Sequence, residues 1–211
     1  LSFLVYAALG VILESNLIWV FALLSLGGWM GTETGYMSGW GAYYLGMNYP
    51  LRFVLFGSGL VVTGQFAFSR WKSRQDFQHV TQIMGMLYLF IALWILSIFG
   101  NYGSIDNWSR ATHVQLFGWS VLFAGAALAA IYVGIKTGNA AFRGFGITFI
   151  FINLYTRYFE YFWDGTHKAI FFSVLAISFW LLGSRAENIW TLQFSSDEEE
   201  TPKDEGTSQT R

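Results

Sequence analysis

Four polar residues with helical spacing are the strongest candidates for chemistry in this sequence. They are Asn153, Arg157, Glu160 and Asp164, whose positions i, i+4, i+7 and i+11 share one face of a helix. Arg157 and Glu160 are within ion-pairing reach of each other. Charges inside a bilayer are costly, and they mark a functional site, a buried pair or a water-lined cavity. One interpretation is an ion, proton or anion path, with Arg157 as the fixed cation and Glu160 as the titrating group.

The alternative interpretation is a structural ion pair within an interfacial belt. Glu160 and Asp164 fall near the predicted outer end of their segment, where aromatic residues gather. These are Tyr155, Tyr158, Tyr161, Phe162 and Trp163. The ends of transmembrane helices commonly carry snorkelling charges and aromatic anchors. The sequence therefore favours the structural interpretation over the conducting one.

A run of glycines spaced four residues apart is the second candidate feature. Gly27, Gly31, Gly35 and Gly39 would line a groove on a continuous helix, where a neighbouring backbone could approach closely. Glu33 lies within this run, so one interpretation is a re-entrant or broken helix with Glu33 in a cavity. A glycine-rich outer loop requires no special role, and the sequence favours it.

The parts of the familiar catalytic and cofactor sites are missing from the sequence. It contains no cysteine, which excludes disulfides, thiolate catalysis and cysteine-ligated metal centres. The histidines, His79, His113 and His167, stand far apart and near segment boundaries, as polar anchors do. No metalloprotease, dinucleotide-binding or P-loop motif is present, and no nucleophile elbow. We therefore expect no cofactor and no nucleic-acid partner, and an enzyme is disfavoured.

The composition indicates that a membrane is the main solvent of this chain. Of its 211 residues 54% are hydrophobic and only 12% are charged, and the mean hydropathy is +0.43. These values are too apolar for an ordinary soluble domain. The aromatic content of 20% fits side chains that end at a headgroup layer. The apolar blocks are longer than barrel strands of about ten residues, which favours helices.

Short polar breaks divide residues 1–194 into a bundle of about six or seven predicted spans. The apolar blocks are 1–13, 17–30, 51–68, 80–99, 114–135, 142–163 and 169–182. The first block is short and opens on Leu rather than Met, so we expect that the fragment boundary cuts the first helix. The sequence thus predicts an all-α, polytopic transmembrane helix bundle.

Two further features concern the ends of the spans and of the chain. Residues 195–211 include the acidic run Asp197-Glu198-Glu199-Glu200 and are predicted to be a disordered tail. Alternating spans place one group of basic residues on one side of the membrane. This group is Arg70, Lys72, Arg74, Lys136, Arg143 and Arg185. The other side receives four basic residues, which are Arg52, Arg110, Arg157 and Lys168. The positive-inside rule makes the first side, and with it the C-terminus, cytoplasmic.

Several motifs carry a resemblance to a known family. They are Gly35-Tyr36 followed by Trp40, then residues 49–53, 153–162 and 168–172. They are similar to the uncharacterised bacterial membrane proteins grouped as a domain of unknown function, family 2157, and the likeness covers most of the chain before the tail. The resemblance implies a bacterial inner (plasma) membrane protein with no assigned activity. It directs interest to the four polar residues and supplies no mechanism.

Two classes of function remain open on the sequence. The favoured class is a membrane-embedded scaffold or assembly component, which contacts the lipid bilayer and membrane-protein partners and needs no solvated charge in the bundle. The alternative is a small transporter or channel subunit that uses the intramembrane pair Arg157 and Glu160, which requires a water-accessible cavity around them. A membrane-bound enzyme would need polar groups that converge from several helices, and spacing alone does not reveal such convergence.

Overall fold

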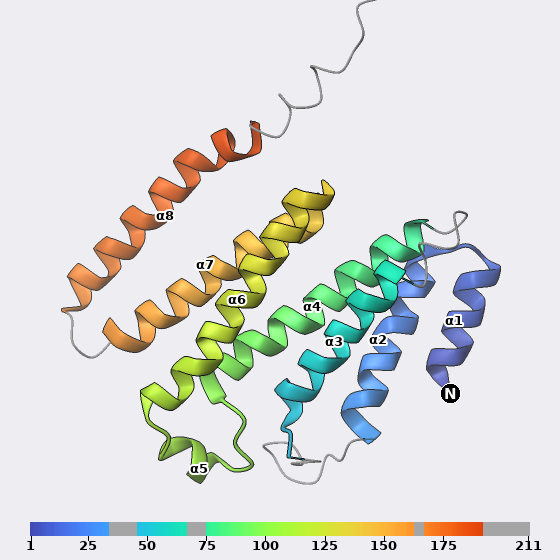
Figure 1. Ribbon diagram of the computed structural model, residues 1–211, viewed down its shortest axis with the longest axis horizontal. Helices are drawn as coiled ribbons and strands as arrows, with labels where there is room; N and C mark the ends of the chain where they lie inside the picture. Colours follow the sequence, from blue (N-terminus) through green and yellow to red (C-terminus); the bar gives the residue numbers. More distant parts are fainter. Residues whose placement is uncertain (34–45, 67–74, 163–166, 192–211) are drawn as a thin grey trace, which may run out of the picture. The chain divides into compact units, whose positions relative to one another are not determined.

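The computed structural model describes residues 1–33, 46–66, 75–162 and 167–191. Every secondary-structure element in these ranges is a helix (Figure 1). The helices are α1 (Ser2–Ile12), α2 (Asn16–Glu33), α3 (Tyr49–Phe66), α4 (Gln75–Phe99), α5 (Ile105–Ser109), α6 (His113–Thr137), α7 (Ala140–Phe162) and α8 (Lys168–Thr191). The predicted all-α class is confirmed for the described residues, and the predicted acidic tail lies outside them.

Three of the described helices are long and apolar enough to cross a membrane. They contain the segments Asp76–Phe99 in α4, Val114–Thr137 in α6 and Lys168–Arg185 in α8. Segments of 18 to 24 residues rise about 27 to 36 Å, which matches a hydrocarbon core of about 30 Å. These helices indicate a membrane location, but they are fewer than the six or seven expected from the sequence.

The other predicted spans fall short because of their length or their polar residues. The apolar segments Ser2–Ile12 in α1 and Asn16–Thr32 in α2 are shorter than 18 residues. In α3, Arg52 and Gln65 dilute the apolar composition, and in α7 the ion pair near its end does the same. The sequence prediction accepted Arg52 and Gln65 as isolated polar residues within a span.

Contacts divide the chain into two compact units, Leu1–Thr156 and Arg157–Arg211. In the first unit, glycines bring the backbones of α3 and α4 close together. A Cβ atom added to Gly85 would lie 2.8 Å from the backbone nitrogen of Val61, and one added to Gly57 would meet the backbone of Leu89. Such close approach through small residues is a common way to pack helices in lipid.

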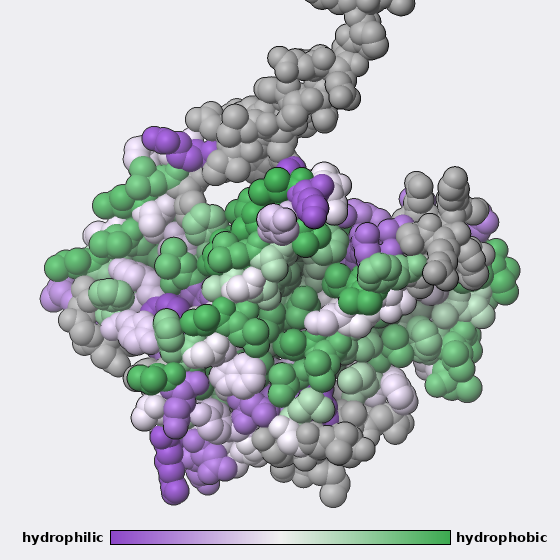
Figure 2. All heavy atoms as spheres, in the orientation of Figure 1, coloured by the Kyte–Doolittle hydropathy of each residue, from purple (hydrophilic) through white to green (hydrophobic). Residues whose placement is uncertain are grey.

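An aromatic core joins α4, α6 and α7 in the same unit. Phe90, Phe123 and Phe149 are all buried there, and Met86 and Leu93 pack with them. The rings of Phe90 and Phe149 stack with their centroids 4.9 Å apart. On the visible face of the molecule, hydrophobic side chains cover the middle of the helices, while hydrophilic ones gather around α5 (Figure 2). The core therefore holds the helices together and leaves an apolar surface outside.

The turn between α1 and α2 places a non-glycine residue in the left-handed region. Glu14 has φ 50°, and the backbone nitrogen of Ser15 donates to the carbonyl of Gly10 at 3.1 Å. This is the hydrogen bond of a Schellman motif, in which glycine is the usual residue at the left-handed position. An L side chain there is strained because its Cβ crowds the backbone.

We expect that Glu14→Gly stabilises the protein by about 0.5 to 1 kcal/mol, because it relieves this strain. Thermal unfolding in detergent measures the change. Glu14→Ala is the matched control, since it removes the carboxylate but keeps the Cβ atom, and it should give little gain. Equal gains from both variants would mean that the carboxylate, and not the backbone, is the source of the strain.

Candidate functional site

Helix α7 carries three of the four polar residues that the sequence singled out. Asn139 caps its start, because the Oδ1 atom accepts hydrogen bonds from the backbone nitrogens of Ala141 at 3.0 Å and Phe142 at 3.4 Å. Asn153 belongs to the first unit, whereas Arg157 and Glu160 belong to the second. The fourth residue, Asp164, lies outside the described residues. The two parts of the candidate site are therefore described one after the other.

Asn153 is bonded to Ser120 of α6 by two hydrogen bonds. The Ser120 hydroxyl donates to Asn153 Oδ1 at 2.7 Å, and Asn153 Nδ2 donates to the Ser120 carbonyl at 2.9 Å. The two residues are 5% and 4% exposed, respectively. Buried polar groups in native proteins are satisfied in this way. The geometry gives Asn153 a packing role between α6 and α7.

One turn further along α7, Thr156 makes a similar contact with α4. Trp94 Nε1 donates to Thr156 Oγ1 at 3.0 Å, and this hydroxyl donates in turn to the carbonyl of Ile152 at 2.7 Å. Sequence reasoning missed Ser120, Thr156 and Trp94 as partners. Each stands inside an apolar block, and their types alone do not reveal which helix they face.

Arg157 and Glu160 form the predicted ion pair, between Nη1 and Oε2. Their side chains are 12% and 20% exposed, so most of the surface of each side chain is covered by the protein. A partly buried charge is tolerated when an opposite charge lies beside it. The pair as a whole carries no net charge. Its geometry is compatible with both interpretations, a structural ion pair and a site on an ion or proton path.

Aromatic contacts fasten the segment that carries the ion pair to α8, within the second unit. The Tyr158 hydroxyl donates to the carbonyl of Phe171 at 3.1 Å, and the two rings stack with centroids 4.7 Å apart. Phe159 packs edge-on against the ring of Phe171, with the ring centroids 4.9 Å apart. Phe171 is fully buried. The contact between Tyr158 and α8 is an addition to the sequence prediction, which placed Tyr158 in an interfacial belt and named no partner for it.

Removing the carboxylate alone should harm the protein more than removing the whole pair. We expect Glu160→Gln to destabilise the chain by about 2 kcal/mol, because Arg157 then keeps a partly buried charge without its carboxylate. The double variant Arg157→Leu with Glu160→Leu should lose less, because no charge remains. Thermal unfolding in detergent compares them, with the exposed Glu14→Gln as the neutral control. A double variant that is less stable than Glu160→Gln would contradict this account.

The glycine run begins inside a helix and not in a loop. Gly27 lies in α2 within the predicted block 17–30, and Gly31 lies in the same helix, which continues to Glu33. The glycine-rich loop was therefore wrong for residues 31–33. Gly27 leaves room for the hydroxyl of Tyr88, which donates to the carbonyl of Leu23 at 3.4 Å. The glycine therefore admits a side chain from α4 and not a neighbouring backbone. The later glycines of the run lie outside the described residues.

Arg52 is a buried cation that sequence reasoning had treated only as a marker of orientation. It is 3% exposed at the start of α3, and its guanidinium lies 4.3 Å from the centre of the Tyr49 ring. Its Nε atom also donates to the carbonyl of Asn48 at 3.4 Å. Asn48 in turn donates to the carbonyl of Gly100 at 2.6 Å. The start of α3 is thus tied to the end of α4.

The two histidines whose side chains the structure describes give no sign of a metal site. His79 lies on α4 and His167 precedes α8, and both are exposed. Within the part of the chain that the structure describes, no group of three His, Asp or Glu residues is placed to hold a metal ion.

Comparisons with known proteins do not assign the chain to a family. No protein-family model matches it, no curated protein does, and no solved structure does. The resemblance to family 2157 accordingly stays a prediction, and the function has to be argued from the helices and their contacts.

Proposed function

We propose that this chain is a polytopic membrane protein that acts as a scaffold or assembly component within the bilayer. The observation that carries the proposal is the use of polar side chains inside the bundle. In the first unit they form hydrogen bonds that join neighbouring helices, and four such pairs are described. These are Trp19 with Thr81, Gln82 with Gln65, Trp94 with Thr156, and Ser120 with Asn153.

These bonds connect α4 to α2, α3 and α7, and α6 to α7. Their donor to acceptor distances lie between 2.7 and 3.0 Å. In lipid, where apolar burial gives helices little reason to associate, polar contacts of this kind and close packing hold them together. Polar groups that bond to one another are less available to coordinate a moving substrate. This distribution supports a structural role.

The proposal includes about six or seven spans, as the sequence predicts. Helix α3 has 18 residues and packs along α4, with which it exchanges close backbone contacts. Helix α7 has 23 residues, and its Phe149 lies in the core shared with α4 and α6. A helix packed lengthwise against a spanning helix shares the same layer of lipid. The polar residues of α3 and α7 are tolerated there because they are bonded.

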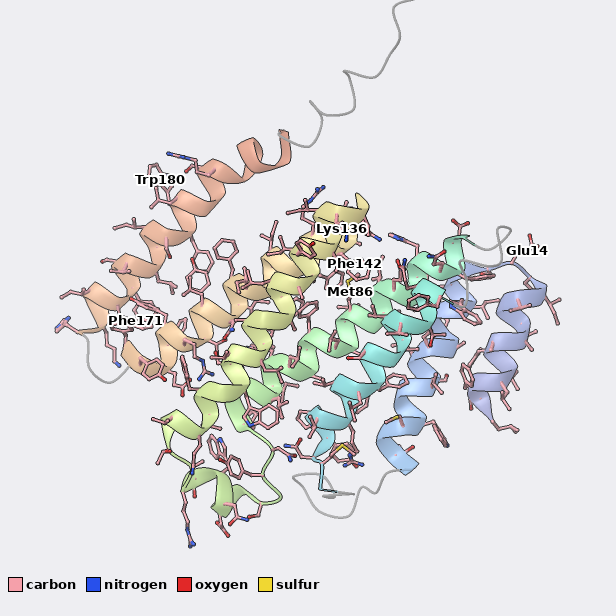
Figure 3. The ribbon with its side chains drawn as sticks, viewed as in Figure 1. Glu14, Met86, Lys136, Phe142, Phe171 and Trp180 are labelled. Atoms are coloured by element: carbon pink, nitrogen blue, oxygen red, sulfur yellow. The ribbon has the colours of Figure 1, made fainter. Side chains whose placement is uncertain are left out.

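The proposed orientation places the basic end of the first unit in the cytoplasm. Glu14 and Lys136 lie toward the same end of this unit (Figure 3), where α3 ends and α4 begins (Figure 1). The basic run at 70–74 connects those two helices in the sequence. At the other end Arg52 is buried and Arg110 is exposed, so a smaller exposed positive charge lies there. This asymmetry supports the positive-inside assignment, and the bacterial inner membrane is proposed from the family resemblance.

The alternative function is a small transporter or channel subunit. The observation that favours it is the ion pair of Arg157 and Glu160, since intramembrane charges often mark a substrate or proton path. This function requires water around both side chains. The scaffold proposal requires none.

Accessibility of single cysteines distinguishes the two functions. The chain contains no native cysteine, so Asn153→Cys, Arg157→Cys and Glu160→Cys can each be probed with a membrane-impermeant thiol reagent from either side. The scaffold proposal predicts no labelling at 153 or 157. Lys136→Cys, at an exposed turn, is the positive control, and Leu128→Cys, on the apolar surface of α6, is the negative one.

Labelling at 153 would overturn the scaffold proposal and support a path through the bundle. Labelling confined to position 164, which can be probed in the same way, would instead support an interfacial belt at the end of α7. Each cysteine variant is compared with the parent protein by size-exclusion chromatography in detergent. Only variants that elute as the parent does are scored, so that unfolding is not mistaken for access.

A further inference from the structure

We draw no further inference here: the strongest candidate, the cavity between the first turn of α1 and the last turns of α2, lined by Phe3, Leu26 and Trp29 with the hydroxyl-bearing Ser25 and Thr32, carries nothing because nothing in the structure shows what covers it.

Discussion

Gly57→Ala is expected to destabilise the bundle by about 1 to 2 kcal/mol, although alanine is the better helix former. The added Cβ atom would meet the backbone of Leu89 on α4, and a backbone cannot swing aside as a flexible side chain can. Overpacking of this kind commonly costs about 1 to 3 kcal/mol. The gain in helix propensity, about 1 kcal/mol, is expected to be the smaller effect.

Gly59→Ala is the matched control for this variant. Gly59 lies on the same helix two residues away, and a Cβ atom added there meets nothing within 4 Å. We therefore expect Gly59→Ala to be neutral or slightly stabilising, opposite in sign to Gly57→Ala. Thermal unfolding of both proteins in the same detergent gives the comparison. If the two variants melted at the same temperature, the close contact between α3 and α4 would not exist as described.

The second large effect is expected at the bond between α6 and α7. Asn153→Leu keeps the branched side-chain shape, with slightly more bulk, and removes both hydrogen bonds to Ser120. Polar contacts between membrane helices contribute about 0.6 to 2 kcal/mol each, and the Ser120 hydroxyl would also lose its acceptor in a buried place. We expect a loss of about 2 kcal/mol in the free energy of unfolding, measured by denaturation in mixed micelles.

Two serines provide the comparison that tests this interpretation. Ser120→Ala removes one of the two bonds and should lose about 1 kcal/mol. Ser173 is exposed on α8, and its hydroxyl donates to the carbonyl of Ala169 on its own helix, so Ser173→Ala should be nearly neutral. The double variant of Ser120 and Asn153 should lose less than the sum of the two single losses, because the residues share one contact. An additive result would mean that they do not act together.

Much of the helical layout could be predicted from hydropathy, because a backbone in lipid has to satisfy its own hydrogen bonds. The predicted block 114–135 corresponds to α6, His113–Thr137, and the block 142–163 to α7, Ala140–Phe162. The first and last residues of the helices were less predictable. Helix α4 starts at Gln75, five residues before the predicted block, because a helix continues through polar residues that hydropathy reads as a break. The short α5, capped by Ser104, lies in the polar break between the blocks 80–99 and 114–135, which was predicted as a loop for the same reason.

The partners of the polar residues could not be predicted from the sequence. Helical periodicity placed Arg157 and Glu160 on adjacent turns of one helix, and their ion pair follows from that spacing alone. The bond between Asn153 and Ser120 joins positions 33 residues apart, and it depends on how α6 and α7 are rotated against each other. The burial of Arg52 has the same origin, because the packing of α3 and not the residue type decides it.

If α7 is one of the spans of the proposed bundle, its ion pair also bears on how this helix would enter the membrane. Both charges lie on one segment, one turn apart, so their neutralisation does not wait for another helix to arrive. An Arg and a Glu on separate helices would each have to partition into lipid as bare charges before they met, and each would oppose insertion. With the pair formed locally, the Arg157 to Glu160 turn can enter lipid without net charge, which leaves Arg143 near the start of α7 as the remaining charged residue of this helix.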